Sequence, residues 1–221
     1  INSLTFLILH PKINAKGSVF MAIKEIKSKI NDNKQEKERK LLNTALHLFS
    51  EKGIKKTSIQ DIVKDAGIAK GTFYLYFKDK YELQDVLLAK TSHELFSKAC
   101  KEATQQQFDR LDDKIVFIID SIIELIVRPN ILKFIQKNLS LGLYSEKLTD
   151  LLDSEELGIK ELFVNEVKEK DIPLEYPEMT LFMIIELVSS TVFTSIVESH
   201  PLPIEEFKPH LYKTIRLLIN E

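Results

Sequence analysis

The sequence predicts an all-α protein, with a three-helix unit near the N-terminus and a larger helical region after it. Apolar residues recur at the three- and four-residue spacing of helix faces along most of the 221-residue chain. No stretch alternates apolar and polar residues convincingly enough to be a strand. Glycine and proline residues fall where these patterns stop, which divides the chain into separate helices.

The first predicted helix runs over residues 34–52 and ends at Gly53, where a helix can close in a left-handed conformation. Its apolar stripe consists of Leu41, Leu42, Ala45, Leu48 and Phe49. Residues 1–33 precede it as an extension and lead-in. Because Met21 opens a lysine-rich helical segment, we interpret residues 1–20 as an addition ahead of the folded chain.

A second, short helix is predicted between a hydroxyl cap at Thr57 or Ser58 and a glycine stop at Gly67. Its apolar face is formed by Ile59, Ile62, Val63 and Ala66. The spacing of these residues allows about two helical turns.

A third helix is expected over residues 70–77, after a turn in which Ile68 is the apolar residue. It places Phe73 and Phe77 four residues apart on one face. Its other side carries Lys70, Gly71, Thr72, Tyr74 and Tyr76. Two short helices joined by a glycine-containing turn form a helix-turn-helix, whose second helix enters the major groove of DNA.

The exposed residue types of the third helix suit DNA. Lysine and threonine can reach base edges or phosphates, glycine permits close approach, and phenolic hydroxyls reach backbone oxygens. A plainer alternative is that the aromatic residues only fill a core. That alternative explains Phe73 and Phe77, but it does not explain two tyrosines on other faces beside Lys70 and Lys80.

The run from Asp61 to Lys80, DIVKDAGIAKGTFYLYFKDK, resembles the DNA-binding signature of the TetR family of bacterial transcriptional regulators, and the resemblance covers residues 37–88. It implies a homodimer that binds DNA and responds to a small-molecule effector. It implies base contacts from Lys70, Gly71 and Thr72, and phosphate contacts from Thr57, Tyr74, Tyr76 and Lys80. Where the family often has a serine that caps the recognition helix and touches phosphate, this chain has Ala69.

Charge is divided unevenly along the chain. Residues 1–90 hold 17 Lys+Arg against 10 Asp+Glu, a net charge of +7, whereas residues 91–221 hold 14 against 23, a net charge of −9. Because lysine and arginine neutralise phosphates, this division favours DNA contact by the N-terminal part. A chance fluctuation among solvated charges is the alternative interpretation.

Beyond residue 80 the patterns predict helices only. Asp79 is the expected N-cap of a long helix over residues 80–106 that joins the two parts of the chain. Further helices are predicted over residues 114–128, 131–139, 155–170, 178–199 and 203 or 205 to 220. We therefore assign residues 34–80 to a helix-turn-helix DNA-binding domain and residues 81–221 to an effector-binding and dimerisation domain.

The last two predicted helices carry long apolar stripes, for which we expect a partner chain. The residues expected at the dimer interface are Ile185, Val188, Val192, Ile196, Leu211, Ile215 and Leu218. Large apolar patches usually mark interfaces, and two such helices could pair with their symmetry mates in a four-helix bundle. An ordinary core within one chain is the alternative.

Aromatic residues in the second half of the chain are expected to line an apolar effector pocket. These residues are Phe117, Phe134, Tyr144, Phe163 and Phe182. Aromatic side chains at helical spacing fill cores more often than they line pockets, so a filled core is the alternative.

The single cysteine, Cys100, excludes an intrachain disulfide and is expected to be half-buried.

Motifs of common enzyme and metal sites do not occur in this sequence. Its six glycines form no G-x-G-x-x-G or Walker loop, its five histidines form no H-E-x-x-H, and there is no G-x-S-x-G. We expect no catalytic residue, no metal, no cofactor, no membrane span and a cytoplasmic location.

Taken with the resemblance, these patterns favour a DNA-binding regulator, in particular a repressor released from a palindromic operator by its effector. A helical carrier or protein-interaction module without DNA binding is the main alternative, and an enzyme with an unfamiliar site is a third.

Overall fold

The computed structural model describes residues 15–135, 138–144 and 159–220, and that part of the chain contains helices and no strand. The helices are α1 (Ala15–Lys56), α2 (Ile59–Ala66), α3 (Lys70–Phe73), α4 (Lys80–Ala103), α5 (Leu111–Ile126), α6 (Pro129–Ile135), α7 (Leu139–Leu143), α9 (Ile159–Glu169), α10 (Pro177–Glu198) and α11 (Ile204–Asn220). The all-α prediction is confirmed. The first fourteen residues of the predicted extension lie outside the described residues.

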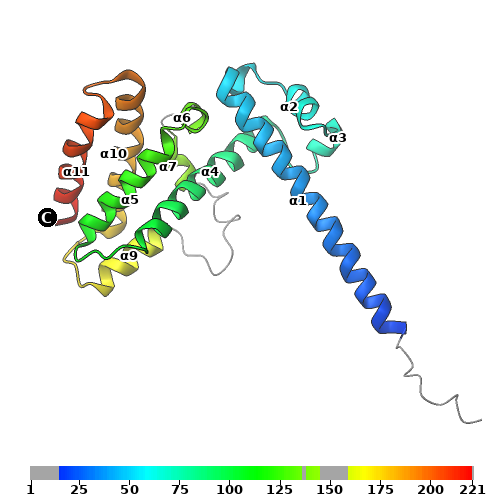
Figure 1. The fold of residues 1–221 in the computed structure, drawn as a ribbon, viewed down its shortest axis with the longest axis horizontal. Helices are drawn as coiled ribbons and strands as arrows, with labels where there is room; N and C mark the ends of the chain where they lie inside the picture. Colours follow the sequence, from blue (N-terminus) through cyan, green and yellow to red (C-terminus); the bar gives the residue numbers. More distant parts are fainter. Residues whose placement is uncertain (1–14, 136–137, 145–158, 221) are drawn as a thin grey trace, which may run out of the picture.

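Two groups of helices share the long helix α4 (Figure 1). Helices α1, α2 and α3 form the N-terminal group, and α4 leads from it into a bundle built with α5, α7, α9, α10 and α11. Helix α6 packs against α1 and so joins the two groups a second time. At that junction the rings of Phe49 and Phe134 are stacked with their centroids 6.4 Å apart.

Helix α1 begins at Ala15, well before the predicted start at residue 34, and its N-terminal part runs away from the rest of the protein in Figure 1. Residues 18–40 contain neither glycine nor proline, so nothing in them interrupts a helix. At Gly53, the predicted stop, the backbone (φ 79°, ψ 158°) leaves the helical conformation, and a short helical turn follows the kink up to Lys56.

The core of the N-terminal group is formed by the residues that periodicity predicted. Leu41, Ala45 and Ile62 are fully buried, and Val63 is nearly so. Phe73 from α3 completes this core. Burial of these side chains holds α1, α2 and α3 together. Helices α2 and α3 are too short to be stable by themselves.

Polar contacts between residues far apart in sequence hold α11 against α5. Asp112 is buried and accepts hydrogen bonds from Arg110, Arg216 and Asn220. The hydrogen bonds that Arg110 donates are the main reason why the pKa of Asp112 lies well below its usual range. These contacts fix the outer wall of the bundle.

Helix α10 is long and apolar enough, by length and mean hydropathy alone, to cross a membrane. The sequence led us to expect no such helix, because Glu186 interrupts the apolar run. In the structure α10 packs against α7, α9 and α11, and a core helix passes the same test of length and hydropathy.

Candidate nucleic-acid interface and ligand cavity

The start of α2 is fixed by a reciprocal pair of hydrogen bonds between Ser58 and Asp61. The Asp61 N–H donates to Ser58 Oγ over 3.1 Å, and the Ser58 N–H donates to Asp61 Oδ2 over 2.9 Å. This capping box satisfies two backbone donors that the helix leaves unpaired. The bond from the Ser58 N–H is also the main reason why the pKa of Asp61 falls to about 2.

The end of α2 is fixed by Gly67, which adopts a left-handed conformation with φ of 66°. The Ile68 N–H donates to the Val63 carbonyl over 2.9 Å, and the Gly67 N–H donates to that of Lys64 over 3.2 Å. These two bonds form a Schellman motif, which turns the chain sharply into α3. Both ends of α2 are therefore defined by local chemistry, and the predicted stop is confirmed.

Helix α3 is shorter than predicted, since it runs from Lys70 to Phe73 and is followed by turns through residue 76. The N–H groups of Tyr76 and Phe77 both donate to the Phe73 carbonyl over 3.0 Å, which tightens the chain beyond a regular helix. Ala69 occupies the N-cap position and provides no side-chain hydrogen bond. Burial of Phe73 and Phe77 keeps this segment in place.

The outer side of α3 and the following turn presents a mixed basic and aromatic surface. Lys70, Gly71 and Tyr74 are exposed, whereas Thr72 and Tyr76 are half-buried. Leu75 is the most exposed of the large hydrophobic residues in the described chain, at 78%. The sequence reasoning left Leu75 out of the site, because the sequence did not show whether an apolar side chain between two phenylalanines points into the core or towards solvent.

Thr57 and Lys80, which the resemblance implied as phosphate contacts, have partners within the protein. Thr57 is 1% exposed, and its hydroxyl donates to the Gly53 carbonyl over 2.9 Å. The Lys80 ammonium donates to the carbonyls of Ile54 and Thr57, each over 2.8 Å. To touch DNA, either side chain would have to leave these partners. In the structure they instead tie the start of α4 to the junction between α1 and α2.

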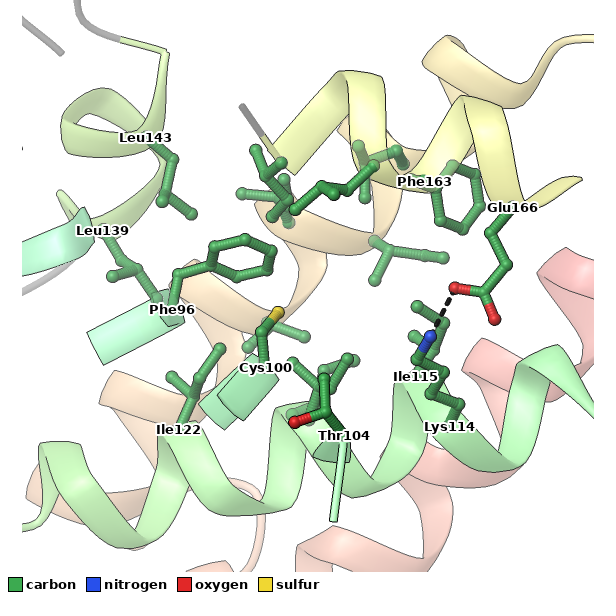
Figure 2. Close-up of a pocket in the computed structure, with 18 residues that line it drawn as sticks. Phe96, Cys100, Thr104, Lys114, Ile115, Ile122, Leu139, Leu143, Phe163 and Glu166 are labelled. Atoms are coloured by element: carbon green, nitrogen blue, oxygen red, sulfur yellow. Dashed lines mark hydrogen bonds and ion pairs between the residues drawn. The ribbon is translucent and has the colours of Figure 1, made fainter. Parts of the chain in front are cut away.

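A largely apolar cavity of about 210 Å³ lies inside the helical bundle (Figure 2). Side chains from α4, α5, α7, α9 and α10 surround it. Helix α4 contributes Phe96 and Cys100, and its C-cap residue Thr104 continues the same four-residue spacing. Sequence reasoning missed this row, although the spacing was available to find it.

Phe163 borders the cavity, but the other four aromatic residues predicted to line a pocket do not. Phe117 packs against Phe108, with ring centroids 5.3 Å apart, and Phe134 packs against Phe49 of α1. Tyr144 and Phe182 contact each other on the outside of the protein, where both are exposed. The cavity wall is mainly aliphatic, because isoleucine and leucine residues of α5, α9 and α10 face inward.

Few polar groups border the cavity, and two of them form an ion pair. Lys114 Nζ lies 2.6 Å from Glu166 Oε2, which joins α5 to α9. Burial raises the pKa of the Cys100 thiol to about 11, so this cysteine stays protonated at neutral pH. No group of His, Cys, Asp and Glu within the described ranges is arranged to hold a metal ion.

Most of the residues predicted at a dimer interface are buried inside the protomer. Ile185 and Val188 border the cavity, and Val192, Leu211 and Ile215 are buried in the core. Ile196 and Leu218 are half-buried. The prediction chose the apolar residues that face the core of the protomer. It could not separate them from those that face solvent, because α10 carries apolar residues on both sides. The exposed apolar residues of α10 and α11 are Met179, Phe182, Met183, Val197 and Leu217.

Comparison with known proteins agrees with these features. Residues 41–86 match the family model described as "Bacterial regulatory proteins, tetR family". The uncharacterized helix-turn-helix regulator YvdT of Bacillus subtilis is 57% identical over 47 residues, which are 21% of this chain and 24% of YvdT. A second B. subtilis regulator, YhgD, is 25% identical over 176 residues, covering 76% of this chain and 88% of its own length.

Solved structures share the fold of almost the whole chain. A putative TetR-family regulator from Syntrophomonas wolfei superimposes with a TM-score of 0.61 at 20% identity, over 85% of this chain and 96% of the other. The FadR regulator from B. subtilis, in complex with stearoyl-CoA, gives a TM-score of 0.57 at 17% identity, over 82% and 97%. Residues 41–86 are thus similar to the DNA-binding segment of the tetR family of bacterial regulatory proteins, and the chain shares its fold with solved TetR-family structures.

Proposed function

We propose that the protein is a sequence-specific DNA-binding transcriptional regulator. The observation that carries the proposal is the helix pair α2–α3, in which α2 is capped at both ends and the α3 segment presents Lys70, Gly71 and Tyr74 to solvent. A helix in this position can enter the major groove, where lysine reads guanine and tyrosine reaches phosphate. The positive charge of residues 1–90 supports the same assignment.

The regulator acts as a homodimer on a palindromic operator. Two recognition helices related by a two-fold axis read half-sites about one helical turn apart. The exposed apolar residues of α10 and α11, among them Phe182 and Leu217, give a second copy a surface to cover. In this arrangement residues 34–80 bind DNA, and residues 81–221 bind the effector and the partner chain.

Helix α4 couples the two activities. At its start, Lys80 is bonded to the carbonyls between α1 and α2, and Asp79 caps the helix by accepting from the N–H groups of Tyr81 and Glu82. Further along, Phe96 and Cys100 border the cavity. A ligand that moves α4 therefore moves the DNA-binding unit.

The protein is a repressor whose effector fills this cavity and favours a spacing of the recognition helices that does not fit the operator. The shared fold with FadR, whose crystal structure is a complex with stearoyl-CoA, supports a regulator that binds a ligand.

The test is equilibrium binding of the purified protein to the DNA upstream of its own coding region, against a scrambled duplex at near-physiological salt. A regulator should prefer the native fragment with nanomolar-range affinity and bind it as two chains per site. Equal, weak binding of both duplexes that disappears with added salt would show only a basic surface. Such a result would leave a helical carrier that uses the same cavity as the better account.

A further inference from the structure

The cavity has a polar end and an apolar end. Figure 2 shows Lys114 and Glu166 on one side, with Phe96, Leu139 and Leu143 on the opposite side. Apart from these two charged residues, Cys100 and Thr104, every residue that lines the cavity is hydrophobic. A ligand with one polar group and an apolar body would match this distribution.

The polar end carries a surplus of positive charge. Glu166 accepts from Lys114 over 2.6 Å through Oε2, and Lys170 Nζ lies 3.4 Å from its Oε1. Two ammonium groups thus share one carboxylate. The Lys114 and Glu166 side chains are only 28% and 20% exposed, so water screens their charges less than it would on an open surface.

An anionic and a cationic ligand would affect this cluster differently. A ligand carboxylate that pairs with Lys114 leaves Glu166 paired with Lys170, so every charge keeps an opposite partner. An ammonium group that pairs with Glu166 would lie beside two lysines. It would also leave Lys114 without its ion-pair partner, since Glu166 is the only partner shown for it within the described residues. Separating a partly buried ion pair in that way is costly.

We infer that the effector is a small amphiphile with a single carboxylate, which binds Lys114 in place of Glu166 while its apolar body fills the cavity. The inference rests on the proposed function, because it names the chemical class of that regulator's effector. A cavity of about 210 Å³ suits an apolar chain or ring of modest size. The ion pair between α5 and α9 is then exchanged for a pair between α5 and the ligand.

The test uses three probes of equal chain length, decanoate, 1-decanol and decylamine, each titrated into the full-length protein by calorimetry below micelle formation. Decanoate should bind about ten- to a hundredfold more tightly than decanol, the range expected for one charge-assisted hydrogen bond. Lys114→Met should remove this preference and leave decanol binding in place. Glu166→Gln should tighten decanoate binding, because the competing carboxylate is gone.

Lys168→Met is the matched control, since Lys168 is exposed on α9 and does not border the cavity. It should leave all three affinities unchanged. Thermal unfolding of each variant checks that the bundle is intact, and if Lys114→Met does not fold, Glu166→Gln decides the question alone. Binding of decylamine as tight as that of decanoate would overturn the inference, as would the absence of binding by all three probes.

Binding of the same preparations to the upstream DNA fragment separates this inference from the proposed function. If sequence-preferring DNA binding persists while decanoate shows no preference over decanol, the effector class is wrong and the regulator remains. If decanoate binds as expected while DNA binding has no sequence preference, the ligand site stands and the proposed function falls.

Discussion

The N-terminal helix pair and the C-terminal bundle are held by contacts of different range. The ends of α2 depend on residues three to five positions apart, such as Ser58 with Asp61 and Ile68 with Val63. The bundle depends on contacts between residues far apart in sequence, such as Asp112 with Asn220. Local caps make a rigid unit that can be presented to DNA, whereas long-range pairs can be exchanged when a ligand enters.

The largest effect is expected from Phe73→Ala, which removes a fully buried side chain from the support of the DNA-binding surface. The cost should be about 3–5 kcal/mol in the free energy of unfolding. Denaturant unfolding measures it. Leu75→Ala, two positions away and highly exposed, should change that free energy by less than about 0.5 kcal/mol. Similar losses in both variants would mean that the buried and exposed sides of α3 and its following turn are assigned wrongly.

Ile215→Ala tests whether the apolar stripe of α11 belongs to the bundle core. Its side chain is fully buried, so the variant should lose about 2–5 kcal/mol of unfolding free energy at a fixed protein concentration. Leu217→Ala changes an exposed residue of the same helix and should instead weaken dimerisation, measured by sedimentation equilibrium. If Ile215→Ala weakened the dimer while unfolding stayed unchanged, the stripe would face the partner chain after all.

Lys70→Ala tests the exposed side of α3. It should cost about 1–3 kcal/mol of binding free energy to the operator and reduce the preference over a scrambled duplex. Fluorescence anisotropy with labelled duplexes measures both quantities. Lys101→Ala, which removes another exposed lysine near the end of α4, should leave the preference intact. Equal losses in the two variants would indicate attraction by total charge without base recognition.

Asp61→Asn should have the smallest effect, visible as a change in the pH dependence of the melting temperature. The pKa of Asp61 is lowered from 3.8 to about 2 in the folded protein. Its carboxylate therefore contributes stability above about pH 4, and this contribution is lost as the pH falls towards 2. Wild type and variant should differ most near neutral pH and converge at low pH. Asp65→Asn, at an exposed position of the same helix outside the capping box, is the matched control for the loss of one carboxylate from α2.

Elements that depend on neighbouring residues could be predicted from the sequence. Gly53 and Gly67 mark real helix ends, and Asp79 caps α4 as expected. Apolar spacing also located α5, α9, α10 and α11 to within a few residues, but it predicted one helix over residues 131–139 where the structure has α6 and α7. The predicted start of α1 at residue 34 was wrong, because residues 18–40 contain neither glycine nor proline and nothing there ends the helix.

The ligand cavity depends on information that single helices do not contain. Met179 and Phe182 on the outside of α10 have the same apolar character as Ile184 and Ile185 on its inside, so composition does not distinguish the two faces. Lys114 and Glu166 are 52 positions apart, so no spacing connects them before the bundle is folded. Phe163 was found because it lies on the inward face of an amphipathic helix.

The most direct test of the central claim is selection of bound duplexes from a random pool by the purified full-length protein, followed by sequencing. The account predicts enrichment of a palindrome whose half-sites are separated by about one helical turn, with weaker enrichment by Lys70→Ala. A pool that stays unenriched through successive rounds, from a protein that is folded and dimeric, would contradict it.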